Sequence, residues 1–144
     1  KHIMIKYITL FFCILTFINC SNNDNLKDCI QTLPLNISKD LNNPEMINVQ
    51  VPGGTVEFSG GAKGILLMNV NGNEFVAYDK MCPVNDCNQP MTFENGIFLK
   101  CQCDNSKYGV GKGIGGAPQS EGFVCPAFEY RVIKSGTVLR ITNF

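Results

Sequence analysis

The sequence has no tryptophan, a single histidine and no excess of charge of either sign. The histidine, His2, lies at the very start, so a mature chain without its N-terminus contains none. Such a domain cannot use a histidine general base, a Ser-His-Asp triad, or a histidine ligand to zinc or to an iron–sulfur cluster. The formal net charge is zero, with 12 basic and 12 acidic residues. Because no basic excess is available to neutralise phosphates, we expect no nucleic-acid partner.

The size and composition indicate one folded domain. The chain has 144 residues, of which 44% are hydrophobic and 17% charged. This length fits one domain. The apolar fraction is enough to build a core and is too high for a wholly disordered chain.

Long hydrophobic runs are also missing. The apolar stretch at 7–18, after Lys1 and Lys6, is too short to span a bilayer and is typical of a signal-peptide core. Asn19 and Cys20 follow this stretch, and a polar, asparagine-rich segment comes next. This pattern resembles a bacterial lipoprotein signal, which implies cleavage of residues 1–20 just before Cys20 and lipidation of that cysteine. The alternative is a plain secretory signal with an incidental cysteine, and under either interpretation the protein is not cytosolic. With the lipoprotein signal, we expect a protein that is lipid-anchored to a membrane of the bacterial cell envelope and faces the periplasm or the exterior.

Two further segments follow the signal. Residues 21–45 are rich in Asn, Asp and Ser and have few large apolar side chains, which predicts a flexible tether. Residues 46–144 are expected to form the folded domain.

The domain has the pattern of short strands and tight turns. The apolar run Ile65–Val70 leads into Asn71-Gly72, a strong hairpin signal, and Phe75–Tyr78 is the answering strand. Apolar and polar residues alternate over 128–132, and Ser135-Gly136 then turns the chain into a final strand. No stretch after position 45 has a convincing helical period. We therefore expect an all-β, antiparallel fold.

Six of the eight cysteines lie beyond Cys13 and Cys20. An even number of cysteines in an oxidising compartment predicts disulfides, and counting alone allows fifteen pairings. The six are Cys29, Cys82, Cys87, Cys101, Cys103 and Cys125.

Four of these cysteines form two short boxes. The first box, 82–87, reads Cys-Pro-Val-Asn-Asp-Cys, and the second, 101–108, reads Cys-Gln-Cys-Asp-Asn-Ser-Lys-Tyr. Their spacing and order resemble the Rieske [2Fe–2S] family. The resemblance implies that Cys82 and Cys101 stand at the positions of the cluster-ligating cysteines. It also implies that Cys87 and Cys103 form the disulfide that braces the two loops.

The resemblance extends to the flanking residues and covers about 46–144. Ser106 and Tyr108 match residues that donate hydrogen bonds toward the cluster and its sulfurs. Gly116 and Pro118 match the proline loop that covers it. The implied fold is an antiparallel β sandwich or barrel base with a small hairpin subdomain at about 80–118.

The departure from the family pattern is equally specific. Val84 and Asp104 occupy the two positions at which the family has its ligand histidines. Two histidines on one iron define a Rieske centre, and valine cannot bind a metal. The chain is similar to a group of bacterial lipoproteins that keep the Rieske-like shell without either histidine. We therefore expect no cofactor.

Three interpretations of the cysteine site follow. In the first, all six cysteines form structural disulfides: Cys87–Cys103 as the resemblance implies, Cys82–Cys101 at the facing loop tips, and Cys29–Cys125. A bridge closing a loop of about fifteen to twenty residues stabilises a domain by about 3 kcal/mol.

The second interpretation is a metal site. Cys82, Cys101 and Asp104, with Asp86 as a further oxygen ligand, offer donors to zinc, and recruiting Cys87 and Cys103 would give the four thiolates of an all-cysteine [2Fe–2S] cluster.

The third interpretation is thiol–disulfide exchange at Cys101-Gln102-Cys103, with Lys100 and Lys107 lowering a thiol pKa. It has the weakest signal, because no Cys-x-x-Cys pair at a helix N-terminus is present.

The first interpretation leads to our functional expectation. The protein is a lipid-anchored accessory that presents a disulfide-braced platform to a protein partner of unknown identity, and it is not an enzyme. The alternative is an electron-transfer protein with an atypical cluster or metal site.

Overall fold

The computed structural model describes Cys29, residues 34–84 and residues 87–144. The predicted signal segment, the lipidation site Cys20, Asp86 and much of the predicted tether lie outside this part of the chain. The described chain forms an antiparallel, nearly all-β fold, which confirms the predicted fold class. Within it, no helix is both long enough and apolar enough to cross a membrane.

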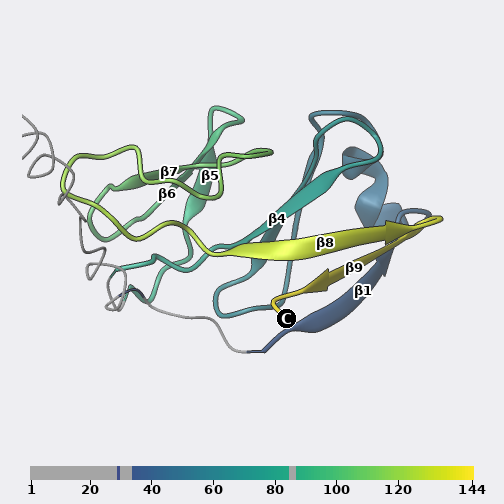
Figure 1. The fold of residues 1–144 in the computed structure, drawn as a ribbon, viewed down its shortest axis with the longest axis horizontal. Helices are drawn as coiled ribbons and strands as arrows, with labels where there is room; N and C mark the ends of the chain where they lie inside the picture. The colour runs from purple at the N-terminus through teal and green to yellow at the C-terminus, as the bar shows by residue number, and fades with distance from the viewer. Residues whose placement is uncertain (1–28, 30–33, 85–86) are drawn as a thin grey trace, which may run out of the picture.

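Two antiparallel sheets make up the fold (Figure 1). The larger sheet has six strands in the order β1-β9-β8-β4-β3-β2, and the smaller has three in the order β5-β6-β7. The strands are β1 (Asn36–Asp40), β2 (Thr55–Phe58), β3 (Ile65–Asn69), β4 (Phe75–Asp79), β5 (Thr92–Glu94), β6 (Phe98–Lys100), β7 (Lys107–Gly109), β8 (Glu129–Ser135) and β9 (Val138–Thr142).

Strands β3 and β4 are buried on both faces, so they separate two cores. Successive side chains of a strand point to opposite faces. Leu66 and Tyr78 accordingly pack into the core beneath the small sheet, with Met91, Leu99 and Tyr108. The other face of β3 and β4 packs into the second core, under β8, β9 and the N-terminal segment. This arrangement explains why 65–70 reads as a continuous apolar run and not as an alternating one.

Both predicted hairpins are present. β3 pairs with β4 around the Asn71-Gly72 turn, where Gly72 has a φ of 92°. β8 pairs with β9 around Gly136, which has a φ of 59°. Glycine adopts this left-handed region at little cost, and other residues rarely do.

Two segments differ from the prediction. Residues 36–40, expected within the flexible tether, form strand β1, which pairs with β9 along its whole length. The pairing is stabilised because Leu35, Ile37 and Leu41 pack against the second core.

The second difference is a short 3-10 helix, η3 (Pro44–Val49), in a region that includes the expected start of the strand-like domain. Its two buried residues, Met46 and Val49, are three apart, so the tight 3.0-residue period puts both on one face against the second core.

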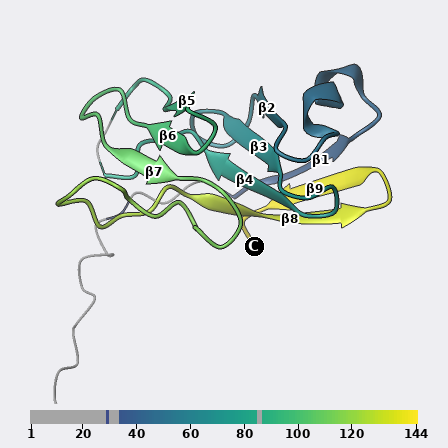
Figure 2. The same cartoon turned by 90° about the horizontal axis from the view of Figure 1, so that it is seen from above.

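The small sheet, which lies within the segment 80–118 where a hairpin subdomain was predicted, is at one end of the larger sheet (Figures 1 and 2). The segment around Pro118 runs antiparallel to β7, with a bridge between Tyr108 and Pro118. The Gly109 N–H donates to the Ala117 carbonyl at 2.9 Å, and the Gln119 N–H donates to the Lys107 carbonyl at 2.7 Å. The proline segment is thus held against the subdomain as a partial fourth strand.

Candidate functional site

Two loops bring four cysteines together at the junction of the two sheets. Cys82 lies three residues after the end of β4, and Cys101 follows β6 directly. The structure joins Cys82 to Cys101 and Cys87 to Cys103, with sequence separations of 19 and 16. A third bridge, Cys29–Cys125, has a separation of 96. These are the three pairs that the disulfide interpretation proposed.

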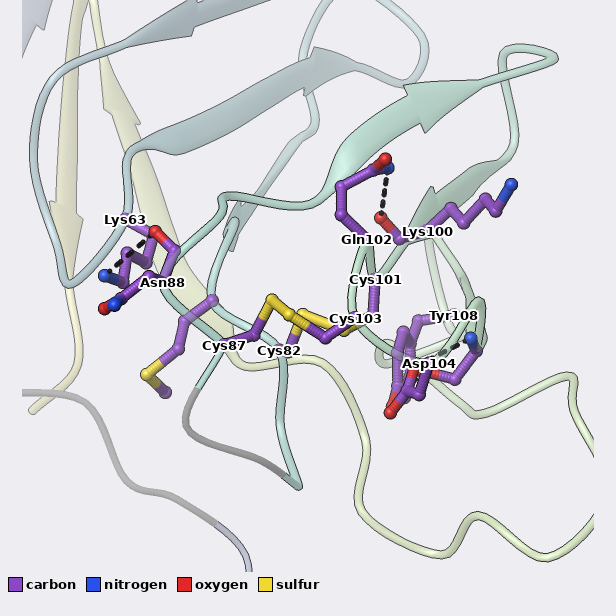
Figure 3. Close-up of a disulfide and its surroundings, with 12 residues drawn as sticks. Lys63, Cys82, Cys87, Asn88, Lys100, Cys101, Gln102, Cys103, Asp104 and Tyr108 are labelled. Carbon is purple, nitrogen blue, oxygen red and sulfur yellow. Dashed lines mark hydrogen bonds between the residues drawn. A yellow bond between two sulfur atoms is a disulfide. The ribbon is translucent and has the colours of Figure 1, made fainter.

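The two loop bridges lie next to each other (Figure 3). The Sγ atoms of Cys82, Cys87 and Cys101 all lie within 4.8 Å of one another, and all three residues are buried. Cys103 is exposed to solvent. One of the two bridges is therefore wholly buried, and the other has one exposed end.

The two residues at the histidine positions do not complete a ligand set. The Val84 side chain has no donor atom and is 43% exposed. The Asp104 carboxylate is engaged locally: its Oδ1 accepts the Ser106 N–H at 2.9 Å and the Ser106 hydroxyl at 2.6 Å. These bonds make Asp104 the first residue of an Asx turn, a common arrangement for a loop aspartate. In the described residues, Cys87 and not Asp104 is the third member of the cysteine group.

Ser106 and Tyr108 form a buried polar chain behind this turn. Their hydroxyl oxygens lie 2.9 Å apart. Because Ser106 has one hydroxyl proton and directs it to Asp104, Tyr108 is the donor in this pair. Burial raises the pKa of Tyr108, and the nearby negative charge of Asp104 adds to the rise. This chain of hydrogen bonds runs from Tyr108 through Ser106 to the Asp104 carboxylate. The two hydroxyls therefore stabilise the Asx turn that Asp104 begins.

The glycine-rich segment is fixed to the rest of the domain by close backbone packing and hydrogen bonds. Gly116 has a φ of 68°, and a Cβ there would lie 2.2 Å from the Ala127 carbonyl oxygen, so only glycine fits. The Tyr78 hydroxyl donates to the Gly111 carbonyl at 3.1 Å and accepts the Gly111 N–H at 3.3 Å. Burial raises the pKa of Tyr78 to about 12, and Glu129 contributes to the shift. The hydroxyl therefore stays protonated and bonded to the loop across the physiological range.

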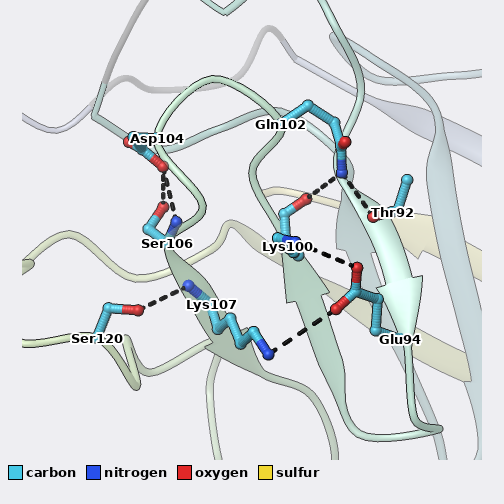
Figure 4. Close-up of polar contacts among 8 residues, drawn as sticks. All are labelled: Thr92, Glu94, Lys100, Gln102, Asp104, Ser106, Lys107 and Ser120. Carbon is cyan, nitrogen blue, oxygen red and sulfur yellow. Dashed lines mark hydrogen bonds and ion pairs between the residues drawn. The ribbon is translucent and has the colours of Figure 1, made fainter.

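The two lysines proposed to activate a thiol are directed elsewhere. Lys100 and Lys107 both pair with Glu94, at 3.7 Å and 3.9 Å (Figure 4). The Lys100 side chain points away from the sulfur atoms (Figure 3). These residues form a charged cluster on the small sheet and give no support to local thiol activation.

Sequence reasoning missed Asp79, the last residue of β4. This carboxylate is fully buried and accepts bonds from the Ala62 N–H at 2.7 Å, the Lys63 N–H at 3.2 Å and the Met81 N–H at 2.9 Å. It also accepts the Tyr130 hydroxyl at 2.6 Å. Asp79 thus fixes the 60–64 loop and the chain entering box one to the sheet.

The donor set does not fit a Rieske [2Fe–2S] cluster. One iron of such a cluster needs two histidines, and the two corresponding positions hold a valine and an Asx-turn aspartate. The two cysteines at the ligand positions are bonded to each other.

Comparisons with known proteins include a similarity to a solved structure. No protein-family model matches the chain, and a search of curated proteins found no match. The chain is similar in structure to the ferredoxin of carbazole 1,9a-dioxygenase from Nocardioides aromaticivorans IC177, with a TM-score of 0.45 and 17% sequence identity. The match covers 75% of this chain and 95% of that one.

Proposed function

We propose that this protein is a Rieske-like domain without an iron–sulfur cluster, used as a disulfide-braced accessory that binds a protein partner at the cell envelope. The Cys82–Cys101 bridge carries the proposal, because it occupies both cysteines at the ligand positions. With Val84 and Asp104 at the histidine positions, the site lacks a set of ligands and has a rigid loop platform instead. The platform is displayed through a lipid anchor on Cys20, and the protein has no catalytic residue of its own.

The cluster-free state is testable by intact mass. Full-length protein expressed with export to the periplasm is expected to weigh six hydrogens less than the reduced chain after allowance for processing. Native mass spectrometry should find no bound metal, and elemental analysis should find no stoichiometric iron or zinc. Two irons and two sulfides, or one zinc, on the purified protein would overturn the proposal.

A soft metal site is the second candidate, and the sulfur group favours it. Thiolates around one zinc lie about 2.3 Å from the metal, and three of the four loop sulfurs already lie within 4.8 Å of one another. This candidate requires both loop bridges to be reduced, so that Cys82, Cys87 and Cys101 become thiolates. Stoichiometric zinc on the exported protein, lost in a Cys82→Ser variant, would support it.

The anchor has its own test. Replacing Cys20 with serine is expected to abolish labelling by an alkyne fatty acid and to release the protein from the membrane fraction, because lipidation requires the Cys20 thiol. Cys13→Ser is the matched control, since it also removes a cysteine from the N-terminal segment but leaves Cys20, and it should keep both signals. Unchanged labelling of Cys20→Ser would contradict the lipoprotein assignment.

A further inference from the structure

The two loop bridges differ in access while their sulfur atoms lie side by side. Cys103 is exposed, and its partner Cys87 is buried within 4.8 Å of both sulfurs of the Cys82–Cys101 bridge. We propose that the pair works as a thiol–disulfide relay, in which an external dithiol reacts at Cys103 and Cys87 passes the exchange to the buried bridge. The relay requires that all four cysteines be oxidised, so it rests on the proposed cluster-free state.

The first step takes place at the solvent-exposed sulfur. A thiolate of the external dithiol attacks the Cys103 Sγ atom, forming a mixed disulfide and breaking the Cys87–Cys103 bond. Cys87 leaves as a thiolate. Attack at this sulfur is favoured because exchange depends on access to the sulfur attacked, and the other three are buried.

The second step occurs inside the cysteine group. The Cys87 thiolate attacks Cys82 or Cys101, both within 4.8 Å, so only local side-chain movement is needed. Attack on Cys82 forms a Cys82–Cys87 bridge and releases Cys101 as a thiolate; attack on Cys101 forms Cys87–Cys101 and releases Cys82. The bond that breaks is replaced by one of the same kind, so this step transfers no net electrons.

The third step resolves the mixed disulfide. The second thiol of the external dithiol attacks the dithiol's other sulfur, the one that is bonded to Cys103. The bond to Cys103 breaks, Cys103 is released, and the dithiol is left as an intramolecular disulfide. The two protons of the external dithiol end on Cys103 and on the released inner cysteine. One protein bridge remains, and two electrons have entered the protein, half of what the two bridges can accept.

The Cys103→Ser variant tests the internal step without any reductant. It leaves one unpaired thiol, initially on Cys87, beside the intact Cys82–Cys101 bridge. After incubation at pH 8.5, acid quenching, alkylation and peptide mapping, we expect at least about a tenth of the molecules to carry the free thiol on Cys82 or Cys101, because exchange among neighbouring sulfurs approaches equilibrium.

Cys87→Ser is the matched control, because it leaves the unpaired thiol on Cys103 instead. Cys103 lies outside the group of three neighbouring sulfurs. Its thiol should therefore stay on Cys103 in the same assay. A free thiol that remains on Cys87 alone in Cys103→Ser, or that migrates equally in both variants, would overturn the relay.

A kinetic measurement on the wild type covers the case in which a single variant does not fold. With one equivalent of dithiothreitol, the Cys82–Cys101 bridge should open at least about tenfold faster in the wild type than in a folded Cys87→Ser/Cys103→Ser protein, which lacks the exposed entry point. Equal rates would refute the relay while leaving the cluster-free state intact. Metal on the wild type in place of the two bridges would instead refute the cluster-free state.

Discussion

Replacing Asp79 with alanine is expected to lower the free energy of unfolding by about 4 kcal/mol, far more than a typical substitution. The carboxylate accepts three backbone N–H groups and the Tyr130 hydroxyl, and it is fully buried. The variant leaves these donors without their acceptor, and a buried unsatisfied donor costs about 1–3 kcal/mol. At a slope of about 2 kcal/mol per molar, the urea midpoint should fall by roughly 2 M.

Two further variants separate the parts of this effect. Tyr130→Phe removes one of the four donors and keeps the ring, so it should cost about 1 kcal/mol. Asp79→Asn keeps the shape of the side chain but presents an N–H₂ group to N–H donors. Its loss in the free energy of unfolding should therefore lie between those of Tyr130→Phe and Asp79→Ala. A midpoint for Asp79→Ala close to that of the wild type would show that the 60–64 loop needs no such anchor.

Gly61 gives independent support for this anchor. A Cβ on Gly61 would lie 2.2 Å from Asp79 Oδ2 and 2.5 Å from the Tyr130 hydroxyl. The loop therefore approaches the carboxylate as closely as its backbone allows. The local sequence does not indicate that Asp79 is an anchor, because most of its hydrogen-bond partners are distant in the sequence. Three of them are 16, 17 and 51 residues away, and only Met81, two residues later, is near.

The features that the sequence predicted are those encoded locally. A tight turn such as Asn71-Gly72 needs a backbone conformation that glycine adopts most easily, so the residue type is itself the signal. The loop cysteines, Cys82 to Cys103, were found in the same way, because their spacing within the two boxes resembles that of a known family.

The features it did not predict depend on distant partners. Strand β1 has polar residues at most of its positions and becomes a strand only because β9, about a hundred residues later, supplies its hydrogen bonds. The local role of Asp104 was not predicted either. Asp104 was a ligand only in the metal-site interpretation of the sequence, and the structure shows that its carboxylate accepts bonds from Ser106, two residues later, in a turn.

Removing the Cys29–Cys125 bridge is expected to cost more stability than removing either loop bridge. Its sequence separation is 96, against 19 and 16 for the other two. In the chain-entropy account, a bridge stabilises by restricting the unfolded chain, and the restriction grows with the logarithm of the loop length. The two loop bridges lie inside the loop that Cys29–Cys125 closes, and they shorten it. With that shortening included, the free energy of unfolding of Cys29→Ala/Cys125→Ala should fall by about 4.5 kcal/mol.

The matched control is Cys87→Ala/Cys103→Ala, which removes a bridge of the same chemistry but closes a much shorter loop. It should lose about 3 kcal/mol. Urea unfolding of both proteins measures the difference, and the slope should rise more for the Cys29 variant because its unfolded state becomes more extended. An equal or smaller loss for the Cys29 variant would mean that native packing around Cys125, not restriction of the unfolded chain, determines what this bridge contributes. The predicted order instead requires the bridge to act mainly on the unfolded state, by joining Cys29 to a residue 96 positions later in the sequence.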